Sequence, residues 1–152
     1  MRQINKYEVR QIKNLLDHDL EHLVKESKDE GFRFVERLLN DYKDGSNAFN
    51  LPGEGLFGVW NEDGVLVAIG GLNKDPFSDG LGIGRLRRFY VRKDYRRNGI
   101  GSLLVNSILD EARKHFKVMV LNTDTEKADK FYTALGFTKG HLYPKATHFM
   151  EL

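Results

Sequence analysis

The most constraining feature of this sequence is a strand-like segment that passes through a basic, glycine-containing turn into a long helix-like segment, over residues 89–102. The first turn of a helix leaves its backbone N–H groups without partners, and the helix dipole adds partial positive charge there. Gly99 and Gly101 place no side chain between these groups and a ligand, while Arg96 and Arg97 add mobile positive charge at the rim. The pattern therefore favours a phosphate or pyrophosphate site over an ordinary strand-to-helix turn.

Two other glycine motifs do not fit the chain. A P-loop requires a lysine directly after its last glycine, and no lysine follows Gly101. The dinucleotide fingerprint requires a third glycine, and Leu104 stands at that place after Gly99 and Gly101. A second glycine pair, at residues 82–84, has Arg87 at the corresponding position. The sequence therefore argues against nucleotide hydrolysis and nicotinamide chemistry.

Hydrophobic periodicity and turn residues divide the rest of the chain into helices and strands. Helices are expected over residues 8–24, from about residue 35 to Gly45, over residues 99–116, and from a capping-box pattern at residues 123–126 to Gly136. Strands are expected at residues 2–4, 56–60, 65–72, 82–91, 118–121 and 147–152. Hairpins make part of such a sheet antiparallel, while helical crossovers make some neighbouring strands parallel.

Two motifs carry a resemblance to a known family. The spacing Arg-x-x-Gly-x-Gly at residues 96–101, after a strand, resembles the acyl-CoA pyrophosphate loop of the GNAT N-acetyltransferase superfamily. Farther along, Ala-x-x-Phe-Tyr-x-x-Leu-Gly-Phe at residues 128–137 resembles the closing motif of that family, and the order of elements agrees over the whole chain. The resemblance implies an α+β fold, with residues 1–152 forming a single GNAT-like domain. Its central sheet would be mixed, mostly antiparallel and twisted, with helices on both faces.

The resemblance also implies an enzyme, an acyltransferase that moves an acetyl group from acetyl-CoA, its co-substrate, to a primary amine by direct attack on the thioester. The backbone of Phe89, Tyr90 and Val91 would pair with the pantetheine arm, much as an added strand would. Tyr132 matches the tyrosine that protonates the departing CoA thiolate in many members. The residues assigned to the pyrophosphate and its surroundings are Arg96, Arg97, Asn98, Gly99, Ile100, Gly101 and Ser102.

The chain departs from the family pattern at two places. Thr125 stands where many members have an asparagine, and Asn122 could either contact the pantetheine or cap the following helix. Some members carry a glutamate as general base on the strand before the pyrophosphate loop. Much of that strand is occupied here by Arg85, Arg87 and Arg88.

The general base and the acceptor stay open at the level of sequence. Glu54, Asp79 and His141 are candidates for the base, and a water relay is the alternative. The loops at residues 45–55 and 73–80 are expected to face the acceptor. A small-molecule amine and a peptide amine both fit, because acceptor pockets are built from loops that vary within one fold.

Two proteins of other classes are alternatives. A non-catalytic CoA-binding or regulatory module would keep the glycine turn without turnover. A nucleic-acid-binding protein would use the basic run at residues 85–97, which is interleaved with aromatic residues. Side chains of a strand alternate between faces, so this run cannot form one continuous stripe. Because 24 basic residues are also offset by 22 acidic ones, we expect no nucleic-acid partner.

Composition limits metal sites and compartments. The chain has no cysteine, which excludes thiolate metal sites and cysteine nucleophiles. His18 and His22 lie four residues apart, a spacing that can bind a metal, but no third ligand is evident, and we expect a solvated helix face and no metal. The apolar runs are too short to cross a bilayer. The expectation is a cytoplasmic protein without a membrane partner, and exposed strands or the C-terminal segment leave a homodimer open.

Overall fold

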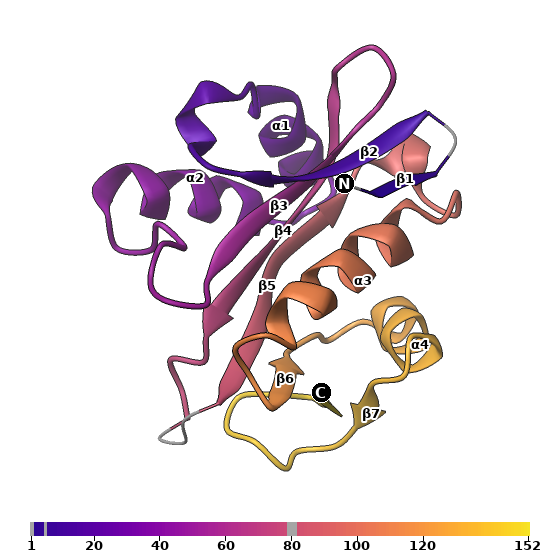
Figure 1. Cartoon of the computed structure of the whole chain (residues 1–152). Coiled ribbons are helices and arrows are strands. Elements are labelled where there is room, and N and C mark those ends of the chain that lie inside the picture. Colours follow the sequence, from indigo (N-terminus) through magenta and orange to yellow (C-terminus); the bar gives the residue numbers. More distant parts are fainter. Residues whose placement is uncertain (1, 5, 79–81) are drawn as a thin grey trace.

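The computed structural model describes residues 2–4, 6–78 and 82–152, which form one twisted eight-stranded sheet (Figure 1). Its strand order is β1-β2-β3-β4-β5-β6-β8-β7. Neighbouring strands are antiparallel except β5 and β6, which run parallel. The mixed, mostly antiparallel sheet expected from the sequence is therefore confirmed. The strands are β1 (Arg2–Ile4), β2 (Tyr7–Ile12), β3 (Gly55–Trp60), β4 (Leu66–Lys74), β5 (Ile83–Val91), β6 (Val118–Leu121), β7 (Thr138–Lys139) and β8 (His148–Glu151).

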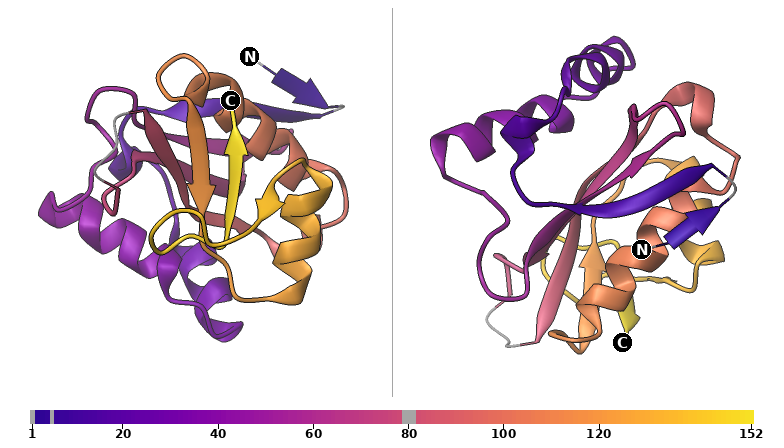
Figure 2. Two further views of the ribbon diagram at one scale, coloured as in Figure 1. Left: turned by 90° about the horizontal axis from the view of Figure 1, so that it is seen from below. Right: turned by 45° about the horizontal axis from the view of Figure 1, so that its top comes forward.

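Helices cover both faces of the sheet, as Figure 2 shows. The helices α1 (Glu21–Asp29) and α2 (Phe34–Asp44) pack on one face, in a core that also contains Tyr90 of β5. The helices α3 (Ile100–Ala112) and α4 (Glu126–Ala134) pack on the other face. Two short 3₁₀ turns, Leu15–Asp17 and Lys93–Tyr95, complete the described elements. The α+β class with helices on both faces is confirmed.

The helix expected over residues 8–24 is wrong. Residues of β2 pair with β3 instead, and α1 begins only at Glu21. Val9 and Ile12 are spaced as on one face of a helix, yet both are buried in a strand. In a strand, residues three apart point to opposite faces. Here both faces are covered by helices, so Val9 enters the core beneath α3 and Ile12 enters the core beneath α2.

The other expected helices are present with changed ends, since α3 stops at Ala112 and not at residue 116, and α4 starts later than predicted. Helix α2 ends at Gly45, which has a left-handed φ of 82°. The N-cap of α4 is Thr125, whose hydroxyl accepts a hydrogen bond from the Ala128 N–H at 3.1 Å. The predicted capping box therefore starts two residues too early, at residue 123, and the cap belongs to Thr125.

The sheet opens beside the C-terminal half of β5. Strand β5 pairs with β6 only from Ile83 to Arg85, opposite Val118–Val120. Its later residues keep their pairing with β4, including Tyr90 opposite Ile69 and Val91 opposite Ala68. Among the described residues, no strand pairs with the other edge of β5 beyond Arg85. This unpaired stretch leads through the 3₁₀ turn directly into α3.

Candidate active site

The unpaired edge of β5 is formed by the backbone of residues 86–91. An extended chain with amide groups can add to such an edge as a further strand. The sequence assigns Phe89, Tyr90 and Val91 to this role, and all three lie in the unpaired stretch. The Val91 carbonyl already accepts a hydrogen bond from Arg96 Nε at 2.9 Å. The Arg92 N–H donates to the Val67 carbonyl at 2.8 Å, so in the alternating antiparallel pattern Tyr90 directs its N–H and carbonyl to Ile69 of β4, and the Val91 N–H faces the open edge.

The side chains of this stretch point to opposite faces. The Phe89 ring lies 5.9 Å from that of Phe131 and 6.2 Å from that of Tyr132 on α4, measured between ring centroids. The Tyr90 side chain lies on the other face, where its hydroxyl oxygen is 2.6 Å from Glu26 Oε2 and 2.5 Å from Glu30 Oε1. Burial and these two carboxylates raise the pKa of Tyr90, so its hydroxyl remains a hydrogen-bond donor to α1.

The start of α3 exposes backbone donors. The first backbone hydrogen bond of the helix runs from the Leu103 N–H to the Gly99 carbonyl at 3.0 Å. The N–H groups of Ile100, Gly101 and Ser102 therefore have no partner within the helix. Gly99 has a φ of 79°, and nothing lies within 4 Å of the position that a Cβ would take. This terminus has the geometry and the dipole that bind a phosphate.

Glycine is needed at position 101 for a different reason, which is the close packing of neighbouring side chains. A Cβ at this position would lie 3.1 Å from Cζ of Phe131 and 3.7 Å from Cζ of Phe89. The glycine thus lets α4 and the unpaired stretch of β5 approach the first turn of α3. The two glycines of the motif act separately, since one allows the left-handed turn and the other allows close packing.

The two arginines of the turn differ in their freedom. Arg96 is held by Glu30, with Nη1 and Nη2 at 2.8 and 2.6 Å from the two carboxylate oxygens. The expectation that Arg96 carries a mobile charge is therefore wrong, because the ion pair with Glu30 and the hydrogen bond to the Val91 carbonyl fix its side chain. Arg97 is exposed and has a left-handed φ of 67°. Arg97 and the exposed Asn98 are the side chains of this turn that a ligand can reach.

Tyr132 lies on α4 at the inner side of this region. Its ring is surrounded by those of Phe89, Phe131, Phe137 and His148, at centroid distances of 5.0 to 6.3 Å. The residue is 7% exposed, and its hydroxyl oxygen is not among the buried side-chain atoms that lack a partner. Burial raises the pKa of Tyr132. The phenol therefore keeps its proton at neutral pH and is available as a donor.

Comparison with known proteins identifies the family. Residues 12–137 match the acetyltransferase (GNAT) family. The chain belongs to this family. It is similar to a solved protein from Exiguobacterium sp. 255-15 assigned as an acetyltransferase, with 30% identity and a TM-score of 0.85, covering 95% of this chain and 93% of that one. The GNAT fold expected from the two motifs is confirmed, and the protein is an acetyltransferase.

More distant GNAT structures share the fold. A relative from Salmonella typhimurium, solved with acetyl-CoA, is 18% identical with a TM-score of 0.72 and covers 97% of this chain and 95% of that one. Glucosamine-6-phosphate N-acetyltransferase from Arabidopsis thaliana is 14% identical with a TM-score of 0.61, covering 90% and 94%. These similarities extend over nearly the full length of each chain.

Asn122 and His141 lie together in this GNAT protein. Both line an open surface hollow of about 470 Å³, together with residues 142–147 between β7 and β8. Asn122 does not cap α4, because Thr125 does so. Its contact with pantetheine stays a prediction. His141 is exposed and keeps its place among the candidates for the general base.

The other two candidates for the base have different outcomes. The Glu54 carboxylate accepts hydrogen bonds from the Leu51 N–H at 3.1 Å, the Lys74 N–H at 2.9 Å and Asn73 Nδ2 at 3.0 Å. These bonds tie the loop at residues 45–55 to the end of β4, which is a structural role. Asp79 lies outside the described residues.

The two histidines considered as metal ligands point to different partners. His18 lies outside a helix and packs against the Trp60 ring at 5.4 Å, while His22 Nε2 lies 2.8 Å from the Leu66 carbonyl oxygen. Over residues 2–4, 6–78 and 82–152, no group of three or more His, Asp or Glu side chains is placed to hold a metal ion. No helix in the same residues has the length and apolar character needed to cross a membrane.

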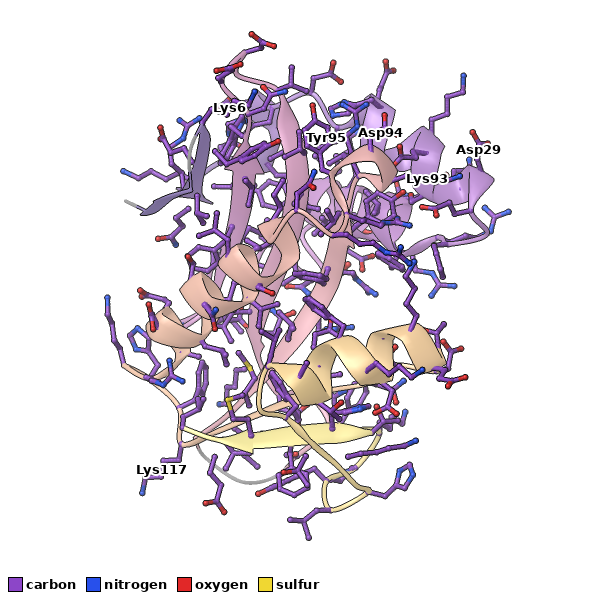
Figure 3. All side chains as sticks on the ribbon, turned by 90° about the vertical axis from the view of Figure 1, so that its right-hand side faces the viewer. Lys6, Asp29, Lys93, Asp94, Tyr95 and Lys117 are labelled. Carbon is purple, nitrogen blue, oxygen red and sulfur yellow. The ribbon has the colours of Figure 1, made fainter. Side chains whose placement is uncertain are left out.

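The sequence missed one residue of the site. Glu30 follows the last residue of α1 and fixes Arg96, which lies 66 residues away in the chain. Its only visible signal was an acidic side chain before Gly31, which is common at helix ends. Figure 3 shows Lys93 and Asp94 beside the end of α1 that carries Asp29, so the 3₁₀ turn and α1 meet in space.

Proposed function

We propose that this GNAT protein acetylates a primary amine by direct attack of the amine on the thioester of acetyl-CoA. The observation that carries the proposal is the continuous path from the unpaired edge of β5 to the N–H groups at the start of α3 that have no partner within the helix. A pantetheine arm needs an edge of amide groups, and a pyrophosphate needs a helix N-terminus. Here both follow one another along the chain within residues 89–102. The Salmonella typhimurium relative with bound acetyl-CoA supports the choice of co-substrate.

In this proposal, different residues bind different parts of acetyl-CoA. The stretch Phe89, Tyr90 and Val91 pairs with the pantetheine arm through those of its backbone groups that face the open edge of β5. The N–H groups of residues 97–102 hold the pyrophosphate, and Arg97 adds charge at its exposed side. Asn122 contacts the pantetheine from the end of β6. A backbone N–H of β5 also polarises the thioester carbonyl, which favours the developing oxyanion.

The reaction proceeds without an enzyme-bound acyl group. The amine lone pair attacks the thioester carbon, a C–N bond forms, and the C–S bond breaks as the tetrahedral centre collapses. The Tyr132 hydroxyl gives its proton to the departing sulfur. The excess proton on nitrogen passes to water or to His141, and the tyrosine regains a proton from solvent. The aromatic rings around Tyr132 hold its ring in place.

The first test is thermal unfolding with acetyl-CoA, ATP and NAD, each at the same millimolar concentration. A ligand at about a hundred times its Kd stabilises the native state by about 2.7 kcal/mol. We expect a rise in Tm of several degrees with acetyl-CoA alone. Release of free CoA thiol with a panel of amines then tests turnover. Stabilisation by ATP or NAD instead of acetyl-CoA would contradict the proposed use of the turn.

A further inference from the structure

Two consecutive arginines of β5, Arg87 and Arg88, lie on the same face of the sheet. Side chains of a regular strand alternate, but the β4–β5 pairing has a register shift here and Arg88 has a φ of 57°. Arg87 Nη1 lies 3.4 Å from Oδ1 of Asn73. The same oxygen accepts a hydrogen bond from Asn47 Nδ2, in the loop after α2. Arg88 Nη2 lies 3.6 Å from Oδ2 of Asp41 on α2. Both guanidinium groups therefore face the side of α1 and α2.

Several guanidinium N–H donors of Arg87 and Arg88 have weak hydrogen bonds or none. Arg88 Nε is buried and has no hydrogen-bond partner among the described residues, although a buried donor is normally paired. The contact of Arg87 with Asn73 is long for a hydrogen bond. Arg85, two residues earlier, shows the contrast. Its Nε, Nη1 and Nη2 donate to Asp75, Lys145 and Pro144 at 2.7, 2.8 and 2.9 Å.

The charge around the pair is also unbalanced. Burial lowers the pKa of both Arg87 and Arg88. The positive charges of Arg88 and Arg85 lower the pKa of Arg87 further. The charge of Arg37 does the same to Arg88. Asp41 acts in the opposite direction on both. Asp75 also favours charged Arg87, but it already forms a buried ion pair with another arginine. Two partly desolvated guanidinium groups thus share one carboxylate, at 3.6 Å from only one of them.

We infer that Arg87 and Arg88 bind an oxyanion, a carboxylate or a phosphate, that is part of the amine acceptor. This inference rests on the proposed function and specifies its acceptor class. The planar fork of an arginine matches carboxylate and phosphate oxygens in two-point hydrogen bonds. An oxyanion would supply the missing charge for the pair, and it would contact the accessible part of the two guanidinium groups beside the buried Arg88 Nε.

The position of the pair agrees with an acceptor role. Arg88 directly precedes Phe89 and Tyr90, where the proposed function places the pantetheine arm and thioester. A strand advances about 3.3 Å per residue, so the bound oxyanion would lie within roughly 10 Å of the reacting carbon. One small molecule can therefore carry both the amine and the oxyanion. The pair faces α1 and α2, whereas Tyr132 lies on the opposite face.

Matched acceptors test the inference. Thiol release is measured for an amino acid and its carboxamide, and for an amino sugar phosphate and the unphosphorylated amino sugar. The proteins are wild type, Arg88→Gln, Arg87→Gln and Arg113→Gln, the last being a control at an exposed ion pair after α3. For the preferred oxyanion-bearing amine, we expect each β5 variant to raise KM about tenfold or more. The variants should leave KM for the uncharged partner, and stabilisation by acetyl-CoA, unchanged.

A binding measurement keeps the inference separate from the proposed function. In ¹H–¹⁵N spectra of the arginine side chains, the Arg88 Nε–Hε signal should shift on titration with inorganic phosphate or acetate. Its absence in Arg88→Gln identifies the signal, and Arg87→Gln should weaken the shift. A preference for acetate or for phosphate distinguishes the two oxyanions.

Three outcomes are decisive. If the Arg88 signal moves with neither anion, or if uncharged amines are equally good substrates in all four proteins, the inference is wrong. If the signal shifts and acetyl-CoA fails to stabilise the protein, the proposed function is wrong while the anion site stands. If Arg88→Gln does not fold, the signal in wild type and the kinetics of Arg87→Gln decide.

Discussion

Arg96 and Glu30 form a two-point ion pair that joins the turn before α3 to the end of α1. Their N–O distances are 2.6 and 2.8 Å, and Arg96 also holds the Val91 carbonyl through its Nε. Glu26 on α1 adds a third link, since its carboxylate accepts a hydrogen bond from the Lys93 N–H at 3.0 Å. The end of α1, on one face of the sheet, therefore fixes the turn before α3, where the proposed pyrophosphate site begins. This connection relates acetyl-CoA binding to the position of α1.

Replacing Glu30 by glutamine should weaken both folding and co-substrate binding. The change removes the charge of a two-point pair that is partly exposed, so we expect a loss of about 1–2 kcal/mol in the free energy of unfolding. Acetyl-CoA should bind several-fold more weakly, because the turn loses its anchor. Urea unfolding and calorimetric titration measure the two effects. The control is Glu36→Gln, which breaks a surface ion pair between α2 and Lys28 of α1 and should leave acetyl-CoA binding unaltered. Equal losses of acetyl-CoA affinity in the two variants would contradict the link.

The same pair predicts how stability depends on pH. Hydrogen bonds and charge from Arg96, with a further hydrogen bond from Tyr90, lower the pKa of Glu30 to about 2 from its ordinary 4.5. The folded protein thus holds this carboxylate ionised where the unfolded chain begins to bind a proton. The contribution of Glu30 is full above pH 4.5 and is lost as the pH falls from 4.5 to about 2. Urea unfolding of wild type and Glu30→Gln at several pH values should show curves that converge over this interval, and a constant difference would contradict the assignment.

The sequence predicted the fold class and the position of the glycine turn before α3, but it misplaced one element. The glycine turn was recognisable because a helix start with glycines and arginines has a local signature. Strand β2 was not, since Val9 and Ile12 have helical spacing and only the cover on both sheet faces explains why both are apolar. Local periodicity does not report how many faces of a strand are buried.

The geometry of the arginines was also beyond the sequence. Arg87 and Arg88 were seen as part of a basic run whose side chains should alternate. The bulge that places them together depends on pairing with β4, a contact between segments separated by a hairpin. Likewise, Gly101 was assigned to ligand access, whereas its packing against Phe131 depends on how α3 and α4 approach each other.

Replacing Tyr132 by phenylalanine should separate catalysis from folding. We expect kcat to fall about a hundredfold, because the thiolate would leave without a proton donor. The Tm should stay nearly equal, since the variant keeps the buried aromatic ring and its packing against Phe131 and Phe137. Steady-state thiol release and thermal unfolding measure the two quantities. Tyr7→Phe, a change on β2 at a ring that packs only on Tyr95 among the described aromatic pairs, is the control, and unchanged turnover in Tyr132→Phe would remove the proposed acid.

Replacing Gly99 by alanine should weaken acetyl-CoA binding beyond its effect on stability. Gly99 and Gly64 have nearly equal left-handed φ values of 79° and 77°, and neither has an atom within 4 Å of the position of a new Cβ. Alanine should therefore cost about 1 kcal/mol of folding free energy at either position. Only Gly99 precedes the free N–H groups of α3, so only Gly99→Ala should raise the Kd for acetyl-CoA, by an expected tenfold or more. Calorimetric titration of both variants measures this difference. Equal affinities in the two variants would mean that the turn is structural and that the pyrophosphate binds elsewhere.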